Sequence, residues 1–144
     1  MQADSKHSRT TASISWLALA VASVGVLAVA AWLEPDARGY GTHAQLGLPP
    51  CGFRWLTGVA CPGCGLTTSF AHAIRGQWAL AGAVHPLGVV LFVAVCASLP
   101  ISIVAALRGW SFGAVFDRFA LGRWGLAVAC CAALVWIVRL AETL

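Results

Sequence analysis

Charged side chains are scarce in this chain. Only 10% of its 144 residues are Asp, Glu, Lys or Arg, against roughly 25% in soluble domains, and 60% are hydrophobic. The nine Lys and Arg residues are scattered, with no basic block and no interleaved aromatic platform, so the sequence excludes nucleic acid as a partner. It also contains no internal repeat, low-complexity tract or heptad pattern. The composition therefore predicts one helical membrane unit, with the lipid bilayer as its surroundings.

Long stretches have no charge at all, and they predict three transmembrane helices at about residues 14–33, 86–107 and 124–140. Pro86 suits the first turn of the second helix, where its missing N–H would be unpaired anyway. The third stretch has fifteen uncharged residues between Arg123 and Arg139, about 22 Å of helix, so both arginines must reach outward to span a bilayer. The predicted fold class is all-α, a small polytopic helical membrane protein with a single domain, 1–144.

The Lys and Arg counts predict the orientation. Five lie in the N-terminal tail and the loop between the second and third helices, against four in the first loop and the C-terminal end. By the positive-inside rule, the N-terminus is cytoplasmic and the loop 34–85 is extracytoplasmic. An alternative is a cleaved signal peptide comprising Met1 to Ala30, but the apolar run continues through Leu33 and favours an uncleaved anchor.

Carboxylates and histidines are missing from the predicted spans. Lipid-modifying enzymes and transporters generally need such groups inside the membrane, so we rank this class of function last. The spans do contain Cys96, Cys130 and Cys131, which we expect to pack as small hydrophobic side chains.

The residues most able to carry chemistry are three cysteines in the first loop. Cys61 and Cys64 form the segment Cys-Pro-Gly-Cys-Gly, and Cys51 lies ten residues before Cys61. Three thiolates predict a knuckle for Zn²⁺ or another thiophilic metal, which takes four ligands in a tetrahedron. The candidates for the fourth ligand are His43, His72, His85, a carboxylate, water or a second protomer. His72 is the weakest of them, because a helix starting near Cys64 would place it about 12 Å further along the axis.

Two other interpretations of the same cysteines remain open. If Pro62 is the first helical residue, Cys61 and Cys64 form a catalytic redox pair at a helix N-terminus, where the thiol pKa falls. No thioredoxin-like βαβ pattern surrounds the pair, and that context usually gives a CxxC its redox meaning. The other interpretation is a structural disulfide joining Cys51 to Cys61 or Cys64.

The remainder of the loop is too apolar for a solvated linker, and we expect it to lie in the membrane interface or on the spans. Leu66 to Arg75 predicts a short interfacial helix, followed by Gly76 in a left-handed conformation. We expect His85 to cap the helix that starts at Pro86. Arg54 and Arg75 are expected to meet lipid phosphates or helix-end carbonyls.

Several ordered motifs in this loop resemble a family of small bacterial integral membrane proteins defined as a domain of unknown function. The motifs are PCGFR at 50–54, LTG at 56–58, CPGCGLT at 61–67, Arg75-Gly76 and His85-Pro86. The resemblance covers about fifty residues and implies a bacterial cytoplasmic membrane location and further spans, without a reaction. Many members have Arg where this chain has Thr68, and Asn is commoner than His85 before the proline. If that Arg acts on an anion, this chain lacks the activity or uses Arg75 instead.

Together these features favour a non-enzymatic membrane component over an enzyme. Its cysteine knuckle would be structural or metal-binding, and it would act with a membrane-protein partner or as a homo-oligomer. The alternative is a membrane-anchored thiol-disulfide oxidoreductase that uses Cys61 and Cys64.

Overall fold

The structure is a computed structural model that describes residues 2–118 and 121–143. The described residues are mainly helical and contain no β-strand, which agrees with the all-α prediction. The elements, in chain order, are α1 (Gln2–Trp32), the 3-10 helix η1 (Thr42–Leu46), α2 (Gly52–Thr57), α3 (Leu66–Ala73), α4 (Trp78–Val84), α5 (Pro86–Arg108), α6 (Phe112–Arg118) and α7 (Leu121–Thr143).

Within residues 2–118 and 121–143, two helices, rather than the predicted three, have an apolar stretch long enough to cross a membrane. These stretches are Ser13–Trp32 in α1 and Pro86–Arg108 in α5, about 30 and 34 Å long at 1.5 Å per residue. The helix α1 itself begins well before the predicted start, at Gln2. The third predicted span does form a helix, α7, but its apolar part, Gly122–Val138, is shorter than the other two.

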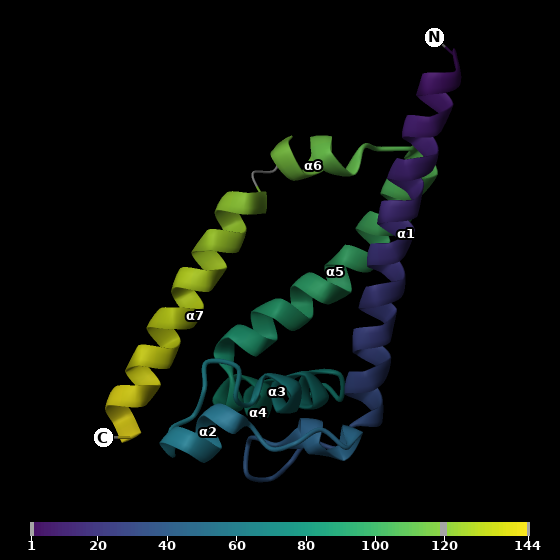
Figure 1. Cartoon of the computed structure of the whole chain (residues 1–144). Helices are drawn as coiled ribbons and strands as arrows, with labels where there is room; N and C mark the ends of the chain where they lie inside the picture. The colour runs from purple at the N-terminus through teal and green to yellow at the C-terminus, as the bar shows by residue number, and fades with distance from the viewer. Residues whose placement is uncertain (1, 119–120, 144) are drawn as a thin grey trace.

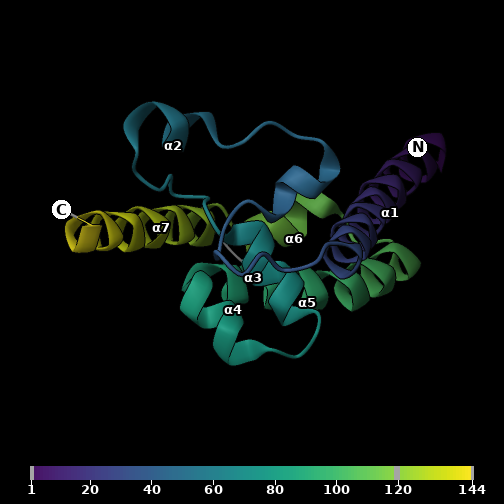
Figure 2. The ribbon, with the colours of Figure 1, turned by 90° about the horizontal axis from the view of Figure 1, so that it is seen from below.

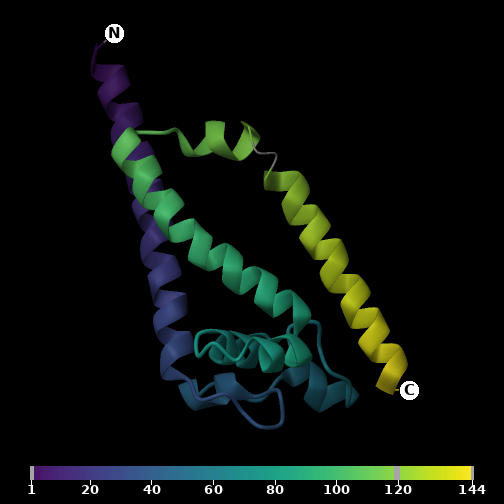
Figure 3. The same cartoon turned by 180° about the vertical axis from the view of Figure 1, so that it is seen from behind.

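The helices α1 and α5 lie against each other at one end and diverge toward the other (Figures 1 and 3). The N-terminus and α6 lie at the joined end, where the indole N–H of Trp16 donates to the Trp110 carbonyl at 2.8 Å. Midway along the pair, the Ser23 and Ser98 hydroxyls lie 2.8 Å apart and link α1 to α5. The C-terminus and the helices α2, α3 and α4 lie at the opposite end.

The helix α3 fills the space where α1 and α5 diverge, and it packs against both (Figure 1). Seen from this end, α3 and α4 overlie α5 while α2 lies to one side (Figure 2). The rings of Phe70 on α3 and Phe92 on α5 meet edge to face, with centroids 5.5 Å apart. Ala30 of α1, Ala73 of α3 and Ala81 of α4 complete this buried cluster. The main core thus lies at the end of the molecule that holds the cysteines.

Arg75 fastens the end of α1 to α3. Its guanidinium donates to the carbonyls of Ala30 at 3.3 Å, Ala31 at 3.0 Å and Ala71 at 2.7 Å. The last carbonyls of a helix have no partner within the helix, so a cation there satisfies acceptors and complements the helix dipole. Of the two roles predicted for Arg75, the structure shows contact with helix-end carbonyls.

A close contact between α3 and α5 depends on Gly88. The Ser69 hydroxyl is fully buried and lies 2.9 Å from the Ala81 carbonyl and 3.2 Å from the His85 carbonyl. A Cβ added at Gly88 would lie 2.5 Å from the Ser69 Oγ and 2.7 Å from its Cβ. Only glycine therefore allows α5 to approach α3 this closely.

Candidate functional site

The fold brings the three loop cysteines together. The sulfur atoms of Cys51, Cys61 and Cys64 all lie within 4.8 Å of one another, and those of Cys61 and Cys64 are 3.3 Å apart. All three side chains are partly buried, and no disulfide joins any of the six cysteines in the structure. A tetrahedral zinc site with Zn–S bonds of about 2.3 Å places its sulfurs about 3.8 Å apart. The observed separations are compatible with this value, so the three thiols suit one thiophilic metal ion.

Two tight turns position Cys61 and Cys64. The backbone N–H of Cys64 donates to the Cys61 carbonyl at 3.0 Å, and that of Leu66 donates to the Gly63 carbonyl at 3.1 Å. The helix α3 begins only at Leu66, so both cysteines precede it. The predicted helix start at Leu66 is confirmed, and the alternative in which Pro62 starts the helix, with Cys64 in its first turn, is not observed. The physical reason is Gly65, whose left-handed backbone separates the turn from the helix.

Gly65 also allows the chain to pass close to another segment. Its φ is +91°, and an added Cβ would lie 2.9 Å from the Gly39 carbonyl oxygen and 3.0 Å from a methyl carbon of Val84. A side chain at this position would therefore be strained and would collide with backbone. The close approach keeps the cysteine turn against the segment after α1 and the end of α4.

His85 connects the cysteine turn to α5. Its Nδ1 accepts the N–H of Gly88 at 3.2 Å, and its Nε2 lies 3.0 Å from the Pro62 carbonyl oxygen. Because Nδ1 is an acceptor, the proton is on Nε2, which donates to Pro62. The side chain is 3% exposed. His85 thus caps α5, as its position before Pro86 predicted, and both ring nitrogens are already engaged, so it is a poor candidate for the fourth metal ligand.

The other predicted ligands also lie outside the cluster. Among the described residues, no His, Asp or Glu joins the three sulfurs within the 4.8 Å that they span. The Nδ1 atom of His72 lies 2.6 Å from the Gln77 Oε1, and His43 lies on η1 beside a cavity that Cys51 and Cys64 also line. A metal held by the three thiolates would therefore take its fourth ligand from something other than these His, Asp and Glu side chains.

The three thiols differ in their electrostatics. Cys51 precedes α2, and its thiol pKa is lowered, chiefly by the backbone N–H of Arg54 and then by the Cys61 thiol. Burial, followed by the Cys61 thiol, raises the pKa of Cys64 to about 12. Without a metal, Cys51 is therefore the more easily ionised of the two, and Cys64 retains its proton.

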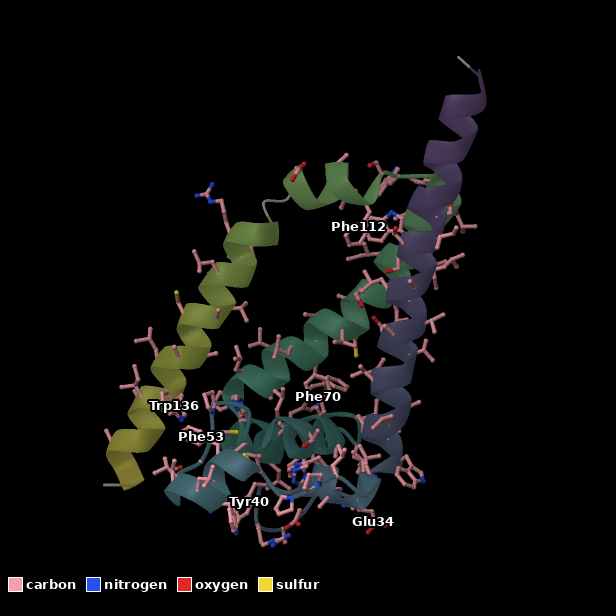
Figure 4. The ribbon with its side chains drawn as sticks, in the orientation of Figure 1. Glu34, Tyr40, Phe53, Phe70, Phe112 and Trp136 are labelled. Carbon is pink, nitrogen blue, oxygen red and sulfur yellow. The ribbon has the colours of Figure 1, made fainter. Side chains whose placement is uncertain are left out.

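A contact from α7 supports the segment before Cys61. The indole N–H of Trp136 donates to the Ala60 carbonyl at 2.8 Å, and the ring lies 6.2 Å, centroid to centroid, from that of Phe53 on α2. Figure 4 shows Phe53 and Trp136 side by side. Trp136 was not predicted to contribute, because the two residues it contacts are more than seventy positions away in sequence.

A second set of contacts that the sequence did not predict fixes the loop after α1. The hydroxyls of Thr42 and Thr68 are both fully buried and lie 2.7 Å apart, and the Asp36 N–H donates to Thr42 at 3.1 Å. Thr68 is the position at which the resemblance leads one to expect Arg in many members. Here it lies inside the fold and holds a loop.

Comparison with known families bears on this part of the chain. Residues 51–99 match the family described as "Protein of unknown function (DUF2752)". The match begins at Cys51, contains all three loop cysteines, α3 and α4, and ends within α5. This match agrees with the resemblance noted in the sequence. It covers the three loop cysteines and the helices that pack beside them. The chain matches no curated protein and no solved structure.

Proposed function

We propose that this chain is a bacterial inner-membrane protein whose Cys51, Cys61 and Cys64 bind a thiophilic metal ion at the extracytoplasmic rim of the membrane. The proposal has two parts, the membrane setting and the metal site. The convergence of the three sulfurs within 4.8 Å is the observation on which the metal site depends.

The surfaces of α1 and α5 support the membrane setting. Only 17% of each apolar stretch is buried, which favours helices that face lipid over the mostly buried core helices of a soluble protein. Their outward residues are large and apolar, for example Val21 at 71% exposure and Leu107 at 83%. Exposing such an apolar surface to water is unfavourable, whereas exposing it to lipid tails is not. The helix α7 is proposed as a third, shorter span.

The contacts of α1 favour an uncleaved anchor over a signal peptide. Ala30 is part of the buried cluster with Phe70 and Phe92, and Arg75 binds the helix-end carbonyls. Loss of α1 would expose this cluster and leave the Arg75 side chain without two of its acceptors. With α1, α5 and α7 as spans, the cysteines share one side with the C-terminus, and the Lys and Arg counts favour the outer side.

The metal would supply structural order to the loop. Metal binding to three thiols offsets the cost of ordering a chain segment that has only short helices of its own. The exposed apolar helix faces suit association with a membrane-protein partner or a second copy of this chain.

A second candidate function is thiol–disulfide exchange. The 3.3 Å separation of the Cys61 and Cys64 sulfurs favours it, because a modest movement would allow a disulfide. The opposite pKa shifts of Cys51 and Cys64 would make Cys51 the better nucleophile. On this view a disulfide of the substrate is reduced while two of the three thiols are oxidised to a disulfide, with Cys51 as a member of the set.

Native mass spectrometry of the detergent-purified chain, with and without chelator and reductant, tests the two functions. A metal site predicts the added mass of one ion, which chelator removes. Neither Cys61→Ser nor Cys64→Ser should carry that added mass. A redox enzyme predicts the loss of two hydrogens per disulfide, restored by reductant, and trapping of mixed disulfides in only one of the two variants. Cys130→Ser, on α7 and far from the cluster in sequence, is the matched control. Free thiols without metal in the wild type would contradict the metal site.

A further inference from the structure

Two cavities lie beside the thiol cluster. The first, of about 260 Å³, is lined by both Cys51 and Cys64, and the second, of about 360 Å³, is also lined by Cys64. Both are lined by Arg38, Tyr40 and Arg54 as well. Sites for drug-sized ligands occupy roughly 300–1,000 Å³, so these cavities suit a small molecule that reaches the sulfurs from the side of Cys64.

The two arginines at these cavities are not equivalent. Arg38 forms a bidentate pair with Asp36, with Nε to Oδ1 at 3.0 Å and Nη2 to Oδ2 at 2.7 Å. This pairing lowers the pKa of Asp36 to about 2, so the carboxylate stays ionised and neutralises Arg38. Among the described residues, no carboxylate lies within ion-pair distance of Arg54. Arg54 therefore brings an uncompensated positive charge to the cavity.

Tyr40 holds the Arg54 side chain in place. The central carbon of the Arg54 guanidinium lies 3.7 Å from the centre of the Tyr40 ring, a cation–π stack. Stacking restricts the side chain but leaves the guanidinium edge free for a planar anion such as a carboxylate. Arg54 also lies beside the thiol cluster in space, because its backbone N–H faces the Cys51 thiol.

We propose that these cavities bind a small anionic ligand that carries a carboxylate for Arg54 and a thiolate for the metal, so that it fills the fourth coordination position. The proposal rests on the proposed metal site and assigns the ligand class of that site. Three protein thiolates leave one position of a tetrahedral ion open, and two of the thiols, Cys51 and Cys64, line the same cavity as Arg54.

Cobalt(II) is a suitable test ion, because its visible spectrum reports the number of thiolate ligands and the coordination geometry. The full chain in detergent, kept reduced with a phosphine, would be loaded with cobalt and titrated with thioglycolate or 2-mercaptoethanol. Both offer a thiol, but only thioglycolate has a carboxylate. We expect thioglycolate to bind roughly ten- to a hundredfold more tightly, the range for a charge-assisted hydrogen bond.

Variants of Arg54 assign this preference to the guanidinium. Arg54→Gln should bring the two thiols to equal affinity with cobalt still bound, and Arg54→Lys should retain part of the preference. Arg108→Gln, which removes a cation from the end of α5 near Trp110, is the matched control and should leave the preference unchanged. If Arg54→Gln fails to fold, the comparison of the two thiols on the wild type and on Arg54→Lys still decides.

The outcomes separate this inference from the function on which it rests. Equal affinity for the two thiols, no spectral change with either, or a preference that survives Arg54→Gln would overturn the ligand class and leave the metal site intact. Failure of the reduced wild-type chain to bind cobalt would overturn both.

Discussion

Replacement of His85 tests how the cysteine turn is held. In the structure, this side chain makes two different bonds: its Nδ1 accepts the Gly88 N–H at the start of α5, and its Nε2–H donates to the Pro62 carbonyl between two of the cysteines. His85→Ala removes both bonds. His85→Asn keeps an acceptor of the right reach for Gly88, but its shorter amide ends before the Pro62 oxygen.

The magnitudes follow from the separate bonds. Loss of a helix cap costs about 1 kcal/mol, and loss of the bond to Pro62 costs about another 1 kcal/mol. Because the imidazole is 3% exposed, its removal also leaves an unfilled space. We therefore expect His85→Ala to lower the free energy of unfolding by about 2–4 kcal/mol and His85→Asn by about 1 kcal/mol. Both variants free the Pro62 carbonyl, so both should bind metal about tenfold more weakly.

Stability and metal affinity must be measured separately. Thermal unfolding followed by circular dichroism, with chelator present, gives the stability of the metal-free chain in detergent. Competition with a chromophoric chelator gives the metal affinity. His72→Ala is the matched control, because His72 bonds to Gln77 and lies outside the cluster. Wild-type metal affinity in His85→Asn would refute the role assigned to Pro62, and unchanged stability in His85→Ala would refute the reasoning as a whole.

Two further predictions concern packing and ionisation. Gly88→Ala should destabilise the chain by about 1–3 kcal/mol, because the new methyl group collides with Ser69. Gly82→Ala, where no atom lies within 4 Å of the added Cβ, should be neutral or stabilising in the same unfolding assay. Equal effects of the two substitutions would contradict the close contact between α3 and α5. In the metal-free protein, iodoacetamide should modify Cys51 at lower pH than Cys64, because the pKa of Cys51 is lowered and that of Cys64 is raised from 9.0 to about 12. At pH 8, this shift makes the thiolate of Cys64 about a thousandfold scarcer than that of an ordinary cysteine, and peptide mapping that found Cys64 modified first would contradict the assignment.

Local patterns in the sequence account for much of the fold. The uncharged runs predicted the positions of α1 and α5, since a helix satisfies its own backbone in lipid and needs only apolar side chains outside. The order His85-Pro86 predicted the start of α5, because a cap and a proline act within one turn. The start of α3 at Leu66 was predicted as well, because the segment from Leu66 to Arg75 contains no Pro or Gly, and the alternative start at Pro62 is not observed.

The sequence by itself determined that two candidate thiols lie together: Cys61 and Cys64 are three apart, and a separation that short brings two thiols together in almost any turn. The tertiary structure brings Cys51, the predicted third thiol, to this pair. It alone decided that His85 bonds to the turn, and that Arg54, which has no ion-pair partner among the described residues, lines the cavity beside Cys51 and Cys64. These relations depend on contacts between segments far apart in the chain, such as Trp136 with Ala60 and Arg75 with α1. No local spacing encodes them, because they exist only once α1, α3 and α5 have packed together and Trp136 of α7 has reached Ala60.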